Sequence, residues 1–237
     1  AFFAQDGKKL VTLANDFTAR LWDFEDKVET NVFKGHKNLL THAAISNDGA
    51  YAVTTSIDNT ARLYATEGSK LIAQLDGHTG DVTYAAISPD GKRVVTTSAD
   101  STARLWRTSD GGLIAKMEGH DGGLTFAAFS HDGQSIATAG MDGTARLWDG
   151  VTGQPEMTLK GHSEGVNYLT FSHDDQRLAT ASKDATARVW NAGSGEELAV
   201  LRGHNKAVTD VRFSPDDQRL ATTSADRTAR IWDGRHY

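Results

Sequence analysis

A period of 42 residues runs through the whole chain and constrains its fold more than any other feature. The tripeptide Thr-Ala-Arg recurs six times at this spacing from Thr18 onward, and the dipeptide Gly-His recurs five times from Gly35 onward. An aromatic residue follows each Thr-Ala-Arg at a fixed offset, and an Asp precedes each one by two residues. Such regularity indicates a repeat architecture, in which each repeat buries its apolar faces against its neighbours.

The repeat from Gly203 to Trp232 predicts strands and turns but no helix. Val211 and Phe213 alternate as in a strand, and Val208, which is one residue out of phase, indicates a β-bulge. A fourth segment, such as 197–201, leads into the next Gly-His of earlier repeats, so we expect four strands per repeat. The other expected elements are a turn over 214–217, a second strand over 219–224, a turn over 225–227 and a third strand over 228–233.

The second strand of this repeat, Leu220 to Ser224, is made of small residues on both of its faces. A sheet with one wet face would instead alternate apolar with charged residues. Small residues on both faces suit a sheet that packs tightly between two others. Radial stacking of four-stranded sheets provides this setting and leaves few exposed edges.

Gly-His, Ser-Pro-Asp-Gly, Ser-x-Asp-x-Thr and Leu-Trp-Asp follow one another in this order, and the pattern resembles the WD40 family over essentially the whole chain. The resemblance implies an all-β, WD40-type β-propeller with six four-stranded blade repeats of 42 residues, complete in itself or part of a larger, seven-bladed ring. The near-uniform Thr-Ala-Arg-Leu-Trp is similar to bacterial members, whose propellers often end large multidomain sensors. We expect one domain over 1–237, with repeats 1–34, 35–76, 77–118, 119–160, 161–202 and 203–237.

The two ends of the chain raise the question of ring closure, which the family usually achieves by pairing strands from both ends in one blade. Phe3 aligns with Phe171 and Phe213 near the end of the first strand, and the chain ends at Tyr237, after the third strand of the sixth repeat. We therefore expect either a ring whose last blade lacks its outer strand, with Ala1–Phe3 beside Val211, or a piece of a larger ring. The absence of an initial Met favours the piece.

Composition excludes several classes of function. The chain has no Cys, which removes disulfides, thiolate catalysis and Cys-based zinc sites, and which is compatible with the cytoplasm. The net charge is −6, so we expect no nucleic-acid partner, because such proteins usually present a basic face. No apolar run is long enough for a membrane span, and we expect no membrane partner.

A His, a Ser and an Asp recur in most repeats, which suggests either a hydrolytic triad or a structural network. Repetition favours the network, because an enzyme needs one such constellation and not one in nearly every blade; we therefore expect no enzyme and no catalytic residue. The resemblance implies that this network also includes the Trp of the third strand. The network residues are His78, Ser98, Asp100 and Trp106, His162, Ser182, Asp184 and Trp190, and His204, Ser224, Asp226 and Trp232.

Departures from the pattern predict looser networks in the first, second and fourth repeats. The first has no Gly-His, the second has Tyr64 in place of Trp, and the fourth has Gly140 in place of Ser. On this basis Asp184→Ala should destabilise the protein more than Asp142→Ala, since Asp142 lacks the Ser partner.

Neither a metal nor another cofactor is expected. Ligands spaced one per blade point to different sectors of a ring and do not converge on one ion. His42, His131, His173 and His236 lie outside the repeat pattern, but His131 and His173 fall in surface turns. The six Arg residues of Thr-Ala-Arg could form an anion-binding ring, but we favour pairing of each with a carboxylate of its own or the next blade.

The sequence favours a non-catalytic scaffold or a sensor or adaptor module that binds a protein or peptide. The alternatives are a propeller enzyme with a site in the central channel, for which no lone cluster of carboxylates or histidines is found, and a structural spacer. By resemblance, three positions per blade reach the face of the Gly-His loops and the second turns. The candidate partner-binding residues on this face are Leu39, Ile57, Asp81, Met141, Asn167 and Lys183.

Overall fold

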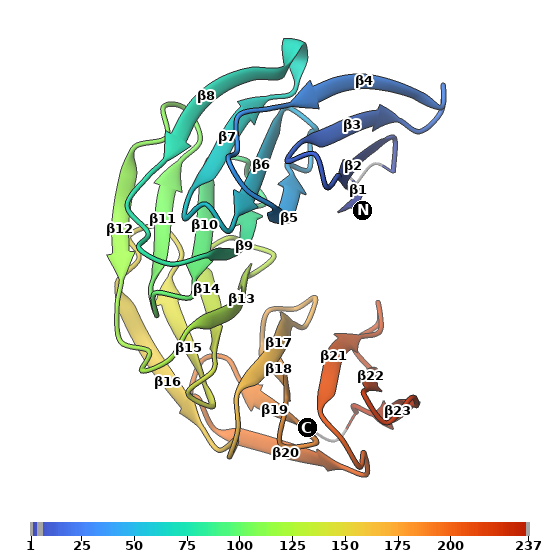
Figure 1. The fold of residues 1–237 in the computed structure, drawn as a ribbon. Coiled ribbons are helices and arrows are strands. Elements are labelled where there is room, and N and C mark those ends of the chain that lie inside the picture. The colour runs from blue at the N-terminus through green and yellow to red at the C-terminus, as the bar shows by residue number, and fades with distance from the viewer. Residues whose placement is uncertain (1, 4–6, 236–237) are drawn as a thin grey trace. The chain divides into compact units, whose positions relative to one another are not determined.

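The computed structural model describes residues 2–3 and 7–235, and their regular structure is almost entirely β-strand (Figure 1). The strands form six antiparallel sheets, which confirms the all-β class and the repeated-sheet architecture. The only helical segment among these residues is the short 3-10 helix η1 (Glu67–Ser69). Contacts divide the chain into a first unit, Ala1–Glu118, and a second unit, Gly119–Tyr237, and we describe each by itself. That the chain forms one domain stays a prediction.

The first unit holds three sheets, and each takes its strands in chain order. The first sheet consists of β1 (Phe2–Phe3), β2 (Lys9–Leu13), β3 (Ala19–Asp23) and β4 (Val28–Phe33). The second consists of β5 (Leu40–Ile45), β6 (Tyr51–Ser56), β7 (Ala61–Ala65) and β8 (Lys70–Leu75). The third consists of β9 (Val82–Ile87), β10 (Arg93–Ser98), β11 (Ala103–Arg107) and β12 (Leu113–Met117).

The second unit repeats the arrangement, except that its last sheet has three strands among the described residues. The fourth sheet consists of β13 (Leu124–Phe129), β14 (Ser135–Gly140), β15 (Thr144–Asp149) and β16 (Pro155–Lys160). The fifth consists of β17 (Val166–Phe171), β18 (Arg177–Ser182), β19 (Thr186–Asn191) and β20 (Glu197–Arg202). The sixth consists of β21 (Val208–Phe213), β22 (Arg219–Ser224) and β23 (Ala229–Asp233).

The bulge and the turn predicted for the last repeat are both present. The register between β21 and β22 shifts between Val208 and Asp210, which confirms the bulge at the start of the strand. The Asp217 amide donates to the Ser214 carbonyl at 2.8 Å, which closes the turn after β21. Asp217 has a φ of 55°, in the left-handed region, and this explains why other repeats place Gly at the same position.

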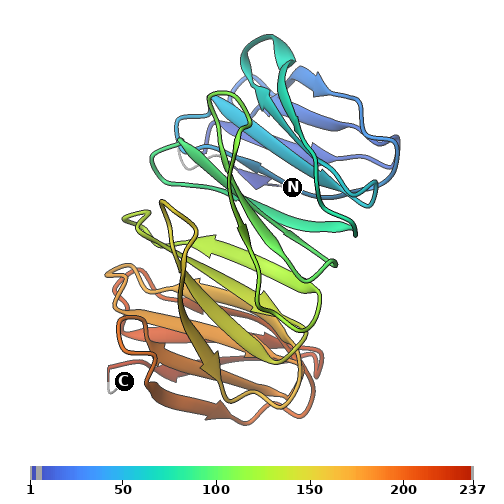
Figure 2. The ribbon, with the colours of Figure 1, turned by 90° about the vertical axis from the view of Figure 1, so that its left-hand side faces the viewer.

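Successive sheets within each unit pack face to face (Figure 2). One apolar cluster joins Val53 and Leu63 of the second sheet to Val94 and Trp106 of the third, and all four are buried. Every residue of β10 is buried, so the second strand of the third sheet packs on both faces, as its small residues allow. In β22, from which this packing was predicted, Ala221 and Thr223 are exposed and only one face is buried.

The first sheet begins where the alignment of Phe3 predicted. Phe3 pairs with Leu10, as Phe171 pairs with Leu178 in the fifth sheet. Ala1 lies outside the described residues, and ring closure or membership of a larger ring stays a prediction. No helix in the described part of the chain is long and apolar enough to cross a membrane.

Candidate functional site

Four polar side chains of the fifth sheet form a continuous chain of hydrogen bonds, which we call the polar relay. His162 Nδ1 lies 2.8 Å from Asp184 Oδ2, and His162 Nε2 lies 2.8 Å from Thr180 Oγ1. Trp190 Nε1 donates to the same Thr180 oxygen at 2.9 Å. A carboxylate only accepts and an indole only donates, so the Thr hydroxyl donates to His Nε2, and His Nδ1–H donates to Asp.

Thr, and not Ser, links His to Trp in this relay, which corrects the composition inferred from the resemblance. The Ser182 hydroxyl instead donates to the carbonyls of Glu164 and Gly165, and it accepts from the backbone amide of Asp184 at 3.1 Å. Ser182 therefore joins the second turn to the Gly-His loop. The same relay recurs through His78, Asp100, Thr96 and Trp106, through His120, Asp142, Thr138 and Trp148, and through His204, Asp226, Thr222 and Trp232.

The relay of the fourth sheet is complete, so the expectation that Gly140 loosens it was wrong. His120 Nδ1 lies 2.9 Å from Asp142 Oδ2, and Trp148 reaches Thr138 at 2.9 Å, as in the fifth sheet. The missing hydroxyl would have contacted the backbone amide of Asp142, not its carboxylate. Gly140 removes a loop contact and leaves the relay intact.

The first and second sheets do carry shorter networks. In the second sheet His36 contacts Asp58 and Thr54, but the Tyr64 hydroxyl donates to the Lys34 carbonyl at 3.0 Å. In the first sheet, which has no Gly-His, Trp22 donates to Thr12 at 2.8 Å, and the Asp16 carboxylate pairs with Arg20 instead of a His.

Burial and hydrogen bonds fix the protonation states of the relay. Burial lowers the pKa of the His162 imidazole, and Asp184 only partly offsets this effect, so the ring is held neutral. Burial raises the pKa of the Asp184 carboxyl, but hydrogen bonds from Thr186 and His162 outweigh it and bring the pKa to about 2. The same balance holds the pKa of Asp58 and of Asp100 at about 2.

We expect acid to destabilise the fold in two stages. The folded-state pKa of His162 lies below its ordinary value of 6.5, so the unfolded chain binds this proton more readily and stability falls as the pH drops below about 6.5. The Asp pKa values are also depressed, so their contribution is lost between about pH 4 and pH 2. Scanning calorimetry from pH 8 to pH 3 measures this, and a melting temperature that stays constant or rises between pH 7 and pH 5 would contradict it.

The Arg side chain of Thr-Ala-Arg packs against the Gly of Gly-His. Gly77 has a φ of 129°, which disfavours any residue with a side chain, and a Cβ there would lie 2.6 Å from Arg104 Nη1, so the Arg side chain would also have to shift. The expected carboxylate partners are found for Arg20 and Arg188, which bind Glu29 and Glu197. Arg62 instead donates to the Gln74 amide, and Arg104 donates to the Gly77 carbonyl at 2.7 Å. The prediction that every Arg of Thr-Ala-Arg pairs with a carboxylate was therefore wrong.

A backbone hydrogen bond joins the Gly-His loop to the second turn in five sheets, and it places the two sets of candidate binding residues together. The Ile57 amide donates to the Leu39 carbonyl at 3.1 Å, and the Met141 amide donates to the Gly123 carbonyl at 2.9 Å. The remaining pairs are Ala99 with Asp81, Lys183 with Gly165 and Ala225 with Ala207.

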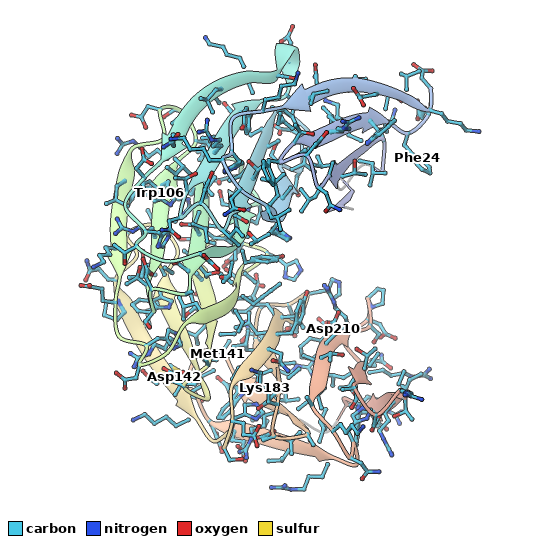
Figure 3. The ribbon with its side chains drawn as sticks, viewed as in Figure 1. Phe24, Trp106, Met141, Asp142, Lys183 and Asp210 are labelled. Atoms are coloured by element: carbon cyan, nitrogen blue, oxygen red, sulfur yellow. The ribbon has the colours of Figure 1, made fainter. Side chains whose placement is uncertain are left out.

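Met141 and Lys183 form the most prominent feature of this face in the second unit (Figure 3). The Met141 side chain is 48% exposed, and Lys183 Nζ lies 3.4 Å from its Sδ. Gly165 lies beneath, where a Cβ would meet Met141 at 3.2 Å. An exposed apolar side chain therefore lies next to a positively charged side chain, and Gly165 packs against Met141.

The other candidate residues divide between exposed and structural positions. Leu39 is 43% exposed and Ile57 is half-buried, and both belong to the second sheet. Asp81 is exposed. Asn167 is half-buried, and its amide donates to the Val208 carbonyl of the next sheet at 2.8 Å. Asn167 therefore links two sheets, which argues against a role in binding.

Two histidines outside the repeat pattern form hydrogen bonds between neighbouring sheets. His131 Nδ1 lies 2.9 Å from Asp175 Oδ1, and this carboxylate also accepts from the His131 and Asp132 amides. His173 contacts Asp217 in the same way. His236 lies outside the described residues. Within residues 2–3 and 7–235, no three His, Cys, Asp or Glu side chains are grouped so that they could hold a metal ion.

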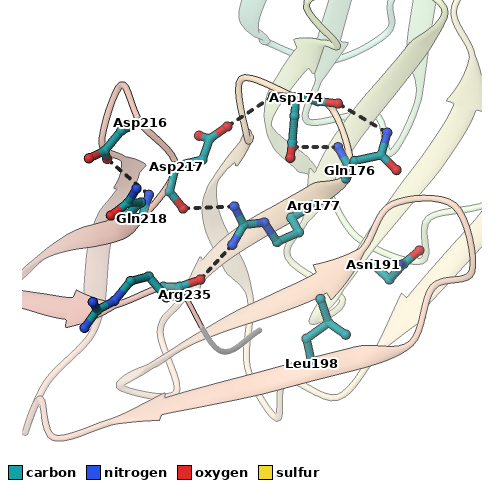
Figure 4. A pocket seen from close by; sticks show the side chains of 10 residues that line it. Asp174, Gln176, Arg177, Asn191, Leu198, Asp216, Asp217, Gln218 and Arg235 are labelled. Carbon is teal, nitrogen blue, oxygen red and sulfur yellow. Dashed lines mark hydrogen bonds between the residues drawn. The ribbon is translucent and has the colours of Figure 1, made fainter.

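A cavity of about 730 Å³ opens between the fifth and sixth sheets (Figure 4). Arg177 crosses it and donates to the Gly234 and Asp217 carbonyls, both at 2.9 Å. An equivalent cavity of about 600 Å³ lies between the first and second sheets, where Lys9 donates to the Gly49 carbonyl. Both cavities occur at the same position of the repeat, so they result from the way in which neighbouring sheets pack.

Comparison with known families gives five matches along the chain. The model described as WD domain, G-beta repeat (WD40) matches residues 27–65, 69–107, 111–149, 153–191 and 195–233. Each match begins near the last strand of one sheet and ends with the third strand of the next, so each contains one Gly-His loop in its first half. No curated protein matches the chain.

Proposed function

Since this chain belongs to the WD40-repeat family, whose repeats generally mediate protein–protein interaction, we propose that it is a non-catalytic scaffold or adaptor that binds a protein or peptide. The face of the Gly-His loops and second turns is the proposed binding surface. A cytoplasmic location and a place in a larger bacterial multidomain protein belong to the same proposal. The first rests on the absence of Cys and the second on the sequence resemblance.

The pair of Met141 and Lys183 is the observation that carries this proposal. An apolar side chain that is 48% exposed costs free energy in water, and contact with a partner would recover it. The neighbouring ammonium adds a charge that selects for an acidic group beside the apolar anchor. The backbone bond between each loop and turn fixes the main chain at both residues, so only their side chains lose conformational freedom on binding.

The burial of the relay supports binding over catalysis. The His162 side chain is 2% exposed and the Asp184 side chain 6%, so neither can reach a substrate from solution. Both nitrogens of His162 are engaged, which leaves no free lone pair to activate a nucleophile. The relay therefore acts as a support for the loops that form the surface.

We expect Met141→Asp to weaken partner binding at least about tenfold, because it replaces an apolar anchor by a charge. The partner is first captured from the native source with the wild-type chain and identified by mass spectrometry. Its affinity is then measured for Met141→Asp and for Ile57→Asp, which tests the corresponding position in the first unit.

Ala225→Asp and Ala99→Asp are the matched controls. They add the same charge at the same turn position, and both alanines are exposed, but the loop residues bonded to them, Asp81 and Ala207, have no large apolar side chain. Equal loss in all four variants would indicate a general charge effect. If Met141→Asp and Ile57→Asp fold and bind the partner with unchanged affinity, the binding site does not lie on this face.

A further inference from the structure

The first strand of the sixth sheet breaks a pattern that the first strands of the second to fifth sheets keep. In those four sheets an aromatic or imidazole ring is followed, two residues later, by a small residue. The pairs are His42 and Ala44, Tyr84 and Ala86, Phe126 and Ala128, and Tyr168 and Thr170. In β21 the same positions hold Asp210 and Arg212, so a carboxylate and a guanidinium replace the ring and the small residue (Figure 3).

Arg212 is held in place from two sides. Its guanidinium carbon lies 4.5 Å from the centroid of the Tyr168 ring on the neighbouring strand β17, at a distance typical of a cation–π contact. Its Nε donates to Asp210 Oδ1 at 3.1 Å. The strands β17 and β21 lie side by side in the second unit (Figure 1), so these three residues form one cluster.

The outer edge of this guanidinium is available to a ligand. The Arg212 side chain is 59% exposed although it is stacked and hydrogen-bonded. The ion pair of Arg212 with Asp210 uses Nε, and the guanidinium also hydrogen-bonds the Tyr168 hydroxyl. A guanidinium has five N–H donors, so further Nη–H groups remain for a ligand. A planar group with two such donors matches the two oxygens of a carboxylate.

The charges of the cluster favour a carboxylate over a phosphate. Asp210 already balances the charge of Arg212, and the chain as a whole carries a net charge of −6. A dianionic phosphate would bring excess negative charge to this position, whereas a single carboxylate brings one charge and still gains two hydrogen bonds. Tyr and Arg are also the residue types in which binding energy most often concentrates at protein interfaces.

We propose that Tyr168, Asp210 and Arg212 form a recognition site for an acidic side chain, Asp or Glu, in an acidic segment of a protein partner. This site rests on the proposed binding function and adds to it a position outside the face of Met141. Arg212 holds the carboxylate through its two Nη groups, Tyr168 supports the guanidinium from below, and Asp210 sets its orientation.

Titration with a hexaglutamate peptide tests the site, with hexaglutamine as the neutral probe. The readouts are the affinity from calorimetry and the NMR resonance of the Arg212 Nε–H group. We expect hexaglutamate, but not hexaglutamine, to shift this resonance, and we expect Arg212→Ala to lower the affinity about tenfold. Arg227→Ala, which removes an exposed Arg elsewhere in the same repeat, is the matched control and should leave the affinity unchanged.

Asp210→Asn separates recognition from a purely structural role. The Asn oxygen still accepts from Arg212 Nε, but the negative charge beside the ligand is gone, so the affinity for hexaglutamate should rise about threefold. Loss of affinity in Asp210→Asn, equal binding of both probes, or tighter binding of inorganic phosphate than of hexaglutamate would overturn the proposal. Failure to capture any protein from the native source would instead count against the proposed function, and the peptide titration would still decide the role of Arg212.

Discussion

Replacing Thr180 by Val is expected to destabilise the protein by about 2–4 kcal/mol, although the two side chains have almost the same shape. Thr180 is fully buried and serves both His162 Nε2 and Trp190 Nε1. Val offers neither a donor nor an acceptor, so two buried polar groups lose their partner at about 1–3 kcal/mol each. The melting temperature should fall by roughly 5–15 °C in a chain of this size.

Thr54→Val in the second sheet is the matched control for this prediction. Thr54 contacts His36 Nε2 and the Tyr64 hydroxyl, but that hydroxyl keeps the Lys34 carbonyl as its acceptor, so only His36 is left without a partner. Its effect should be about half that of Thr180→Val. Equal losses in the two variants, measured by thermal and urea unfolding, would show that the Trp link contributes nothing.

Asp184→Ala and Asp142→Ala are expected to destabilise the protein by similar amounts, about 3–5 kcal/mol each, because both remove a carboxylate that accepts several hydrogen bonds and so leave several donors without a partner. Each carboxylate contacts its His, the amide after that His, and the amide and hydroxyl of a Thr. Of these two sheets only the fifth has the Ser, and it contacts the backbone amide of Asp184, which remains in the Ala variant.

This expectation replaces the unequal effect that the sequence pattern suggested. Ser182→Ala provides the control, since it removes the contact that the fourth sheet lacks and should cost about 1 kcal/mol or less. A loss in Asp184→Ala more than twice that in Asp142→Ala, in urea unfolding at pH 7, would restore the earlier view that the Ser belongs to the relay.

The identity of the hydroxyl in the relay could not be read from the sequence. Thr180 and Ser182 lie two residues apart on one strand, so they face the same side of the sheet. Trp190 pairs with Leu178 in the register, and Ser182 pairs with Val166 at the loop end of the strand. The indole therefore reaches Thr180 on the diagonal. This depends on where the third strand begins relative to the second, and the repeat pattern does not fix that offset.

The Arg212 cluster was also missed, although a signal was present. A lone group of carboxylates or histidines is the pattern expected of a site in the channel, whereas this cluster combines Asp210 with Arg212 and with a Tyr on another strand. Comparison of the first strands with one another reveals the departure. Only packing of β17 beside β21 brings Tyr168 under the guanidinium.

The sequence by itself determined the repeat, the number of strands in each complete sheet, the bulge and the turns, because these depend on residues close together in the chain. The 42-residue period and the small residues of the second strand were sufficient to predict stacked antiparallel sheets. Only the tertiary structure decided which side chains meet across strands and sheets, such as Thr180 with Trp190, Lys183 with Met141, and Arg212 with Tyr168. Those contacts depend on strand register and on the distance between neighbouring sheets, which are set by the packing of the whole unit and not by any local pattern.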